Sequence, residues 1–420
     1  MKRIMLSIII LAAAFTVSNS QERASEWTIE LARSFSSEIF ETNGLPYMEP
    51  MVKAVNASSN ARFFHTAFVP KEVDELYFRF GLHGMAGFVP DRMRTYNPTI
   101  PAEPLDLDKL ERYASVDIVN QQINIQDTAG LINYLFKTLL YNGLQDGSLK
   151  VPETAATILG TSGPPLIIPR DTLQRLAQDH IAFQFLPDHM KDSVLSVIGQ
   201  IPTYFTLPPG GDFSAIFAFV PQLEIGALWG TEMLIRLIPP VDLGKEIGDF
   251  AFWGLGLKHS ISQYFPEPYF DLAVQGVYQG TYLENEIGVT NSNLQANATI
   301  LNFNLQASKS FENIIDVFMG LSFESLSIDA DFEYYLPVEV QAQLGLLRTG
   351  EVNGQPVIFP PEPEKGYPGD TKPQKSNVTL SDFNVKGIFG VAKDIGPLTI
   401  VADYSISDFN IFSGGIIYNF

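Results

Sequence analysis

Phe412-Ser-Gly-Gly-Ile-Ile-Tyr-Asn-Phe420, at the C-terminal end of the sequence, alternates between two kinds of residue. Apolar or aromatic side chains stand at 412, 416, 418 and 420, and most positions between them are small or polar. This period of two predicts a β-strand with one apolar face, as a strand of a membrane-spanning barrel requires. The alternative is a soluble β-protein that happens to finish in phenylalanine, and the features below argue against it.

The same stretch resembles the C-terminal signal of bacterial outer-membrane barrels. Gly415, Tyr418 and Phe420 occupy the glycine, aromatic and terminal aromatic positions of that signal. The polar residue expected before the glycine is replaced by Gly414. The resemblance implies that the barrel-assembly machinery of the outer membrane recognises this tail.

The first twenty residues predict a cleaved signal peptide. Lys2 and Arg3 precede an apolar run over residues 4–17, and Ser18-Asn-Ser20 supplies small residues before a cleavage site at Gln21. The sequence has no cysteine, which excludes a lipoprotein signal, a disulfide framework and Cys-based metal sites.

Composition favours a barrel over a helical membrane protein. Beyond the signal no run of about 18 apolar residues occurs, which a spanning helix would need. Yet 45% of residues are hydrophobic, and 31 Phe and 16 Tyr would supply membrane-facing strands and aromatic girdles. The net charge of −20 argues against nucleic-acid binding. At a lipopolysaccharide surface it allows divalent-cation bridging at most, and ordinary solvated loop charge is the favoured explanation.

The sequence divides into three parts. After the signal peptide, residues 21–70 predict helices, with Ser25 as N-cap of the first and a second over 48–55. This part would plug the barrel or lie beneath it. Residues 71–420 predict the barrel, interrupted by an insertion at 95–212 with several short helices and by a Pro-rich tract at 338–377. Both interruptions are too long for periplasmic turns: the insertion at 95–212 is expected outside the cell or folded into the lumen, and the tract at 338–377 outside the cell.

Alternation predicts twelve strands, an even number that returns the C-terminus to the periplasm. They cover residues 75–88, 214–228, 231–238, 249–260, 269–282, 287–295, 298–309, 314–326, 327–336, 378–391, 398–406 and 410–420. The predicted fold is an all-β membrane protein: a transmembrane antiparallel β-barrel of 12–14 strands with an N-terminal helical plug and long extracellular loops.

Three blocks resemble an uncharacterised family of predicted outer-membrane proteins: residues 46–50 (Pro-Tyr-Met-Glu-Pro), 230–240 and 254–263. Signal peptide, N-terminal helices, aromatic strands and terminal Phe together also resemble the FadL/TodX superfamily of channels for hydrophobic compounds. That resemblance implies a monomeric 14-stranded barrel closed by an N-terminal hatch. The Asn-Pro-Ala hatch motif of characterised FadL transporters is not visible, so the likeness concerns architecture and says little about substrate.

Five charged residues are predicted to face the lumen and to form an ionic belt: Arg79, Glu232, Arg236, Lys258 and Asp271. Glu232 and Arg236 are four apart in a strand, roughly 13 Å, so their partners must come from neighbouring strands. The belt would line a polar gate or hold the plug. The favoured alternative is a structural network that satisfies buried charges in a narrow barrel.

Two Phe-rich stretches are candidates for a hydrophobic ligand pocket. One contains Phe183 and Phe185, and the other contains Phe213, Phe217 and Phe219. Apolar linings with few polar groups are usual for such ligands. The first stretch fits a loop core equally well, and for the second the start of a membrane-facing strand is favoured.

Catalysis has little support. The five histidines show no His-Glu-x-x-His or other metal spacing, and Gly-x-Ser-x-Gly is missing. His259 and Ser260 are adjacent in a predicted strand, so their side chains point to opposite faces. We therefore expect no enzyme activity, no metal and no cofactor.

Two functions remain open from the sequence. The first is an outer-membrane channel of a Gram-negative bacterium for passive uptake of hydrophobic small molecules, fatty-acid-like or aromatic, in a monomer plugged by its N-terminal segment. The second is a non-transporting barrel that binds surface partners through its long loops. Outer-membrane lipid and lipopolysaccharide are the expected surroundings in both cases.

Overall fold

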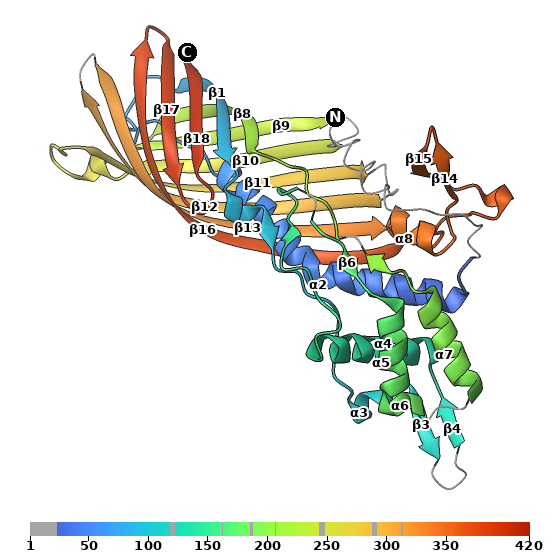
Figure 1. Ribbon diagram of the computed structural model, residues 1–420. Helices are drawn as coiled ribbons and strands as arrows, with labels where there is room; N and C mark the ends of the chain where they lie inside the picture. The colour runs from blue at the N-terminus through green and yellow to red at the C-terminus, as the bar shows by residue number, and fades with distance from the viewer. Residues whose placement is uncertain are drawn as a thin grey trace.

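The computed structural model describes residues 23–117, 122–161, 163–184, 188–205, 207–242, 248–287, 292–311 and 314–420 (Figure 1). Its main body is a closed barrel of ten antiparallel strands in which β1 pairs with both β18 and β8. The strands are β1 (Tyr77–Phe88), β8 (Ala215–Leu228), β9 (Thr231–Asp242), β10 (Asp249–Ser260), β11 (Asp271–Ile287), β12 (Ser292–Phe311), β13 (Ile315–Tyr334), β16 (Gln374–Ile395), β17 (Leu398–Ile406) and β18 (Ile411–Asn419).

The predicted count of 12–14 strands is wrong. Predicted strands 287–295 and 298–309 form most of one strand, β12, and 314–326 and 327–336 together form β13. Neither junction carries the Gly, Pro or Asn-Gly chemistry of a tight turn, and both strands pair with each other without a break. The count stays even because two mergers remove two strands.

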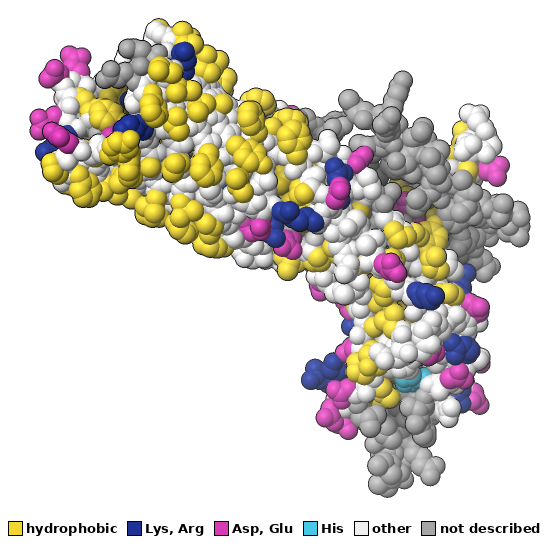
Figure 2. All heavy atoms as spheres, turned by 60° about the vertical axis from the view of Figure 1, so that its left-hand side comes forward, with side chains coloured by type: hydrophobic (Ala, Val, Ile, Leu, Met, Phe, Trp, Pro, Cys, Tyr) yellow, Lys and Arg dark blue, Asp and Glu magenta, His cyan; other side chains and the backbone are white. Residues whose placement is uncertain are grey.

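The alternation predicted for the strands is present. On β10, Lys258 and Ser260 are buried inside the barrel, whereas Trp253, Leu255 and Leu257 are exposed outside it. Figure 2 shows hydrophobic side chains spread over the outer surface of the barrel.

The apolar band on the outside of the barrel ends before the longest strands do, at the end of the barrel away from Phe420. Along β13 the outward side chains are Val317, Met319, Leu321 and Phe323, followed by Ser325, Ser327, Asp329 and Asp331. The outer wall of the barrel therefore changes from apolar to polar within one strand.

One helix, α2 (Glu26–Ser59), replaces the two helices predicted for residues 21–70. Ser25 is its N-cap, as predicted, and accepts a hydrogen bond from the Thr28 N–H. Pro46 and Pro50 lie inside the helix, and Pro50 also lies within the second predicted helix, 48–55. We attribute its continuity to packing, because both halves bury side chains in separate cores.

The first half of α2 packs in a helical domain that we call the head, formed with residues 89–214 and 336–344. Phe35 of α2 lies in its core, with ring centroids 5.1 Å from Phe136 and 4.8 Å from Phe205. The head contains η2 (Asp91–Met93), β2 (Thr95–Tyr96), α3 (Leu107–Leu110), β3 (Ala114–Asp117), β4 (Gln122–Ile125), α4 (Thr128–Gln145), β5 (Ala155–Ala156), β6 (Leu166–Ile167), α5 (Arg170–Asp179), α6 (Ile181–Gln184), α7 (Asp188–Gln200), β7 (Tyr204–Phe205) and α8 (Val338–Gln343).

Four further elements lie in connections. A small hairpin, β14 (Thr349–Val352) with β15 (Gln355–Ile358), and η4 (Pro363–Lys365) lie between β13 and β16, and η3 (Ser262–Tyr264) lies between β10 and β11. No helix within the described ranges is long and apolar enough to cross a membrane.

The second half of α2 enters the barrel where the wall is uneven. β16 pairs with β13 from Gln374 to Ala392 but with β17 only from Gly387 onward, which leaves a step in the wall. α2 lies against the part of β16 before Gly387, where Val52 packs with Leu380 and Asn56 Nδ2 donates to Asp382 Oδ2 at 2.7 Å (Figure 1). The helix thus packs on the inner face of β16, over the part of this strand that β17 leaves unpaired.

Candidate functional site in the barrel interior

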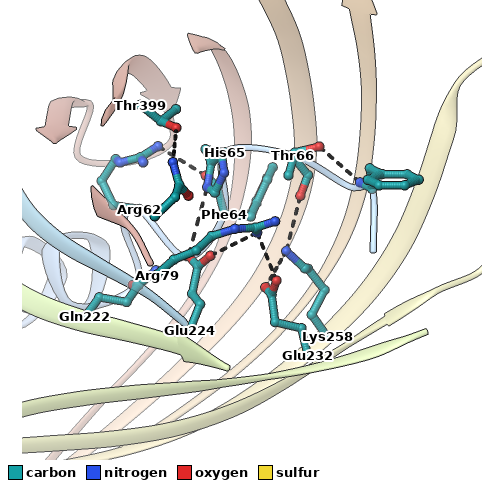
Figure 3. A network of polar contacts seen from close by, with 12 residues as sticks. Arg62, Phe64, His65, Thr66, Arg79, Gln222, Glu224, Glu232, Lys258 and Thr399 are labelled. Atoms are coloured by element: carbon teal, nitrogen blue, oxygen red, sulfur yellow. Dashed lines mark hydrogen bonds and ion pairs between the residues drawn. The ribbon is translucent and has the colours of Figure 1, made fainter. Parts of the chain in front are cut away.

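Three of the five charged residues predicted for the lumen meet at one place (Figure 3). Lys258 Nζ lies 2.6 Å from Glu232 Oε1, and Arg79 Nη1 lies 3.1 Å from Glu232 Oε2. Lys258 and Glu232 are cross-strand neighbours of β10 and β9 and are almost fully buried. Arg79 also approaches Glu224 at 3.5 Å, and Glu224 is a fourth member that the sequence did not single out.

Arg236 lies on the same face of β9 as Glu232, four residues further along the strand. It binds peptide carbonyls instead of a carboxylate. Its guanidinium donates to Ser59 O at 3.0 Å, Ala61 O at 2.7 Å and Arg62 O at 2.8 Å, and Nε donates to Gln222 Oε1. This cation therefore holds the chain that follows α2 rather than closing a ring of ion pairs.

Asp271 does not join the other four residues. It begins β11 opposite Ser308 and is half-buried. Among the described residues it makes no ion pair with Arg79, Arg236 or Lys258.

We call residues 57–67 the lumen segment, because barrel side chains bind its backbone from several sides. Lys386 Nζ donates to Ala57 O at 3.0 Å and Asn60 O at 3.1 Å. Further along, the Ala67 N–H donates to Ser308 Oγ at 2.8 Å and Lys258 Nζ reaches Thr66 O at 3.4 Å. Lys386 and Arg236 meet the free carbonyls at the C-terminal end of α2, where the helix dipole favours positive charge.

Two buried ion pairs accompany these contacts and were not predicted. Arg62 Nη1, from the lumen segment, lies 2.7 Å from Asp403 Oδ2 on β17. Lys386 Nζ lies 2.6 Å from Glu324 Oε1, which also accepts a hydrogen bond from Ser322. All four charged side chains are at most 1% exposed. Strand alternation indicates inward facing for the wall members, but no local signal pairs Arg62 with a strand 341 residues away.

Aromatic contacts also join the lumen segment to the barrel wall. Phe64 of the lumen segment lies 5.6 Å from Phe318, edge to face, and its ring fills the space above Gly320 on β13. Arg236 also lies over the Phe63 ring, 4.2 Å from its centroid. Polar and aromatic contacts together therefore fix the lumen segment against the wall.

The structure does not gather the described phenylalanine candidates into one pocket. Phe217 and Phe219 are each 67% exposed on the outer face of β8, and Phe213 is exposed just before that strand. Phe183 is half-buried in α6, and Phe185 lies outside the described residues. The stretch that contains Phe213, Phe217 and Phe219 therefore leads into an outward-facing strand, which is the interpretation that the sequence favoured over a ligand pocket.

Two of the three C-terminal candidates, Tyr418 and Phe420, lie at one end of the barrel seam between β18 and β1, and Gly415 lies in the middle of that seam. Tyr418 and Phe420 point outward with ring centroids 4.8 Å apart, and the Phe420 N–H donates to Phe78 O at 3.0 Å. Gly415 faces inward, opposite His83.

No cluster of three or more metal-ligating side chains occurs within the described ranges. His259 faces Thr231 and Tyr264, at 2.9 Å each, whereas Ser260 is buried on the other face of β10. Comparison with curated proteins gives no match to this chain. A model of a family of unknown function, DUF6588, matches residues 1–420, and the chain therefore belongs to that family.

Proposed function

We propose that this protein is an outer-membrane barrel, closed by its own lumen segment, that holds the head at the cell surface for binding a partner. The observation that carries the proposal is the filled interior: the lumen segment is tied to the wall by buried ion pairs and by hydrogen bonds to its backbone carbonyls. Such an interior fits an anchor better than an open passage.

The connections between strands support the proposed orientation. At the Phe420 end β8 and β9 are joined by two residues, 229–230, and β16 and β17 by 396–397. At the opposite end lie the head and the connection between β13 and β16. Outer-membrane barrels have short periplasmic turns and long extracellular loops, which favours an extracellular head.

Membrane insertion predicts that charge on the outer wall is costly only within the apolar band. Leu255→Lys, on the exposed face of β10, should lower the free energy of unfolding in lipid by about 2–4 kcal/mol. Ser327→Lys faces outward above the band and should change it by about 1 kcal/mol at most. Urea titration of protein refolded in vesicles measures the free energy of unfolding of each variant. Equal effects of the two variants would contradict the proposed position of the barrel in the membrane.

Surface exposure of the head is tested by protease treatment of intact cells. We expect added protease to cleave within residues 89–214 while the barrel strands stay intact and a periplasmic reporter survives. A head that is cut only after the outer membrane is opened would place it in the periplasm. Recovery of the protein in the soluble fraction would contradict the membrane proposal itself.

A channel for hydrophobic compounds is a second candidate, favoured by one observation. Phe250 and Leu283 are cross-strand neighbours on the inner wall near the outer mouth, where both are only half-buried, and Leu294 lies on the same wall. Apolar side chains at the mouth of a barrel are suited to binding a hydrophobic solute. Uptake of a long-chain fatty acid that depends on this protein would favour the channel over the closed anchor.

A further inference from the structure

His83 occupies an unusual position at the seam that closes the barrel. It lies on β1 directly opposite Gly415 on β18, and Gly81 precedes it by two residues on the same inward face. Its side chain is fully buried, and neither ring nitrogen has a hydrogen-bond partner among the described residues. The imidazole is therefore held by packing rather than by polar contacts.

The two glycines leave the space that the ring fills. A Cβ added to Gly415 would lie 3.0 Å from His83 Cε1 and closer still to Nδ1, and a Cβ added to Gly81 would lie 2.5 Å from Nε2. Neither glycine has a positive φ, so backbone conformation does not require glycine at either position. Glycine inside a strand often marks a close approach of this kind.

Movement of the ring offers little relief. A shift away from a new methyl group at Gly415 brings the imidazole toward Gly81, and on its far side Gly415 is paired with Val401 of β17. The neighbouring Gly414 differs, because a Cβ there would meet only Val401 O, at an ordinary distance of 3.4 Å.

We infer that Gly415 serves closure of the barrel, by making room for His83 across the β1–β18 seam, and that it would be required even where no assembly machinery reads the C-terminal tail. His83 and Gly415 then act as a pair, and Gly81 belongs to the same packing unit. This role is independent of the proposed function of the head and lumen.

The test is refolding of the full-length chain in detergent micelles or lipid vesicles, without assembly factors. Overpacking a buried site predicts that G415A lowers the ratio of folded to unfolded protein by roughly tenfold or more. In an H83A background the same glycine change should cost clearly less, and the loss that remains is due to Leu82 O, which lies 3.1 Å from the added Cβ whether or not His83 is present. Folded protein is measured by its faster migration on unheated gels and by urea titration.

Two further variants make the outcome decisive. G81A should also lose folded protein and recover in the H83A background, although Gly81 lies outside the C-terminal tail, whereas G414A should refold like the unmodified chain. Normal refolding of G415A, or an equal loss from G415A with and without His83, would overturn the inference. If H83A does not refold alone, His83→Ser provides the second background for the same comparison.

Discussion

Replacing Lys386 with methionine is expected to lower the free energy of unfolding by about 3–5 kcal/mol. Methionine keeps much of the side-chain length but leaves Glu324 without its cation, 2.6 Å away in the native protein, at a position with no solvent exposure. It also removes the hydrogen bonds to Ala57 O and Asn60 O. Urea titration of protein refolded in lipid vesicles measures the loss.

A matched control lies on the same strand. Lys375 pairs with Glu333 at 3.2 Å, but these side chains are 76% and 40% exposed, so Lys375→Met should change stability by about 1 kcal/mol at most. A double variant, Lys386→Met with Glu324→Met, should recover much of the loss because no unpaired charge remains buried. Similar effects of the two single lysine variants would show that water reaches Glu324 and that the lumen is not closed there.

The wall of the barrel was largely predictable from sequence because its signal is local. Alternation with a period of two predicted that Lys258 and Glu232 face the lumen, and the structure has both buried there, with Leu255 and Trp253 exposed on the other face. The contact between Lys258 and Glu232 also lies within reach of sequence reasoning, since β9 and β10 follow one another and pair across a short connection.

Strand ends were less predictable. A long strand and two shorter strands in line have the same alternation, and only turn residues distinguish them. β12 and β13 run well beyond the apolar band, and the breaks predicted within them, at residues 296–297 and between residues 326 and 327, do not exist. The single helix α2 was also not predicted; it continues through Pro46 and Pro50 because packing in the head and in the barrel outweighs the missing backbone hydrogen bonds.

The contacts that hold the lumen segment could not be predicted, although a plug from the N-terminal region was, because these contacts join distant parts of the chain. Arg62 and Asp403 pair across the interior, and Arg236 binds carbonyls whose position has no sequence signature. Backbone carbonyls are present at every residue, so a cation that recognises them leaves no pattern of complementary charge.

Replacing Asp403 with asparagine is expected to raise the frequency of channel openings in planar bilayers roughly tenfold or more, whereas the unmodified protein stays closed. Asp403 Oδ2 accepts from Arg62 Nη1 at 2.7 Å and Oδ1 accepts from Ser413 Oγ at 2.5 Å. Asparagine keeps the shape but loses the charge that compensates Arg62. Weakening a buried, hydrogen-bonded charge pair costs about 2–5 kcal/mol, which exceeds the 1.4 kcal/mol of a tenfold change in equilibrium.

The Asp403 substitution is a more specific test than deletion of the N-terminal region. α2 supplies Val52, Ala54 and Ala57 to the cores of the barrel, so deleting it would also expose the apolar inner wall. Asp331→Asn is the matched control: Asp331 lies on the outer face of β13, binds Asn377 and touches no part of the lumen segment, so conductance should not change. Frequent openings of the Asp403 variant with normal folding would mean that the Arg62–Asp403 pair holds the lumen segment in place. If the folded variant stays as closed as the unmodified protein, the carbonyl contacts of Arg236 and Lys386 suffice, and the barrel is a permanent anchor rather than a channel that can be opened at this pair.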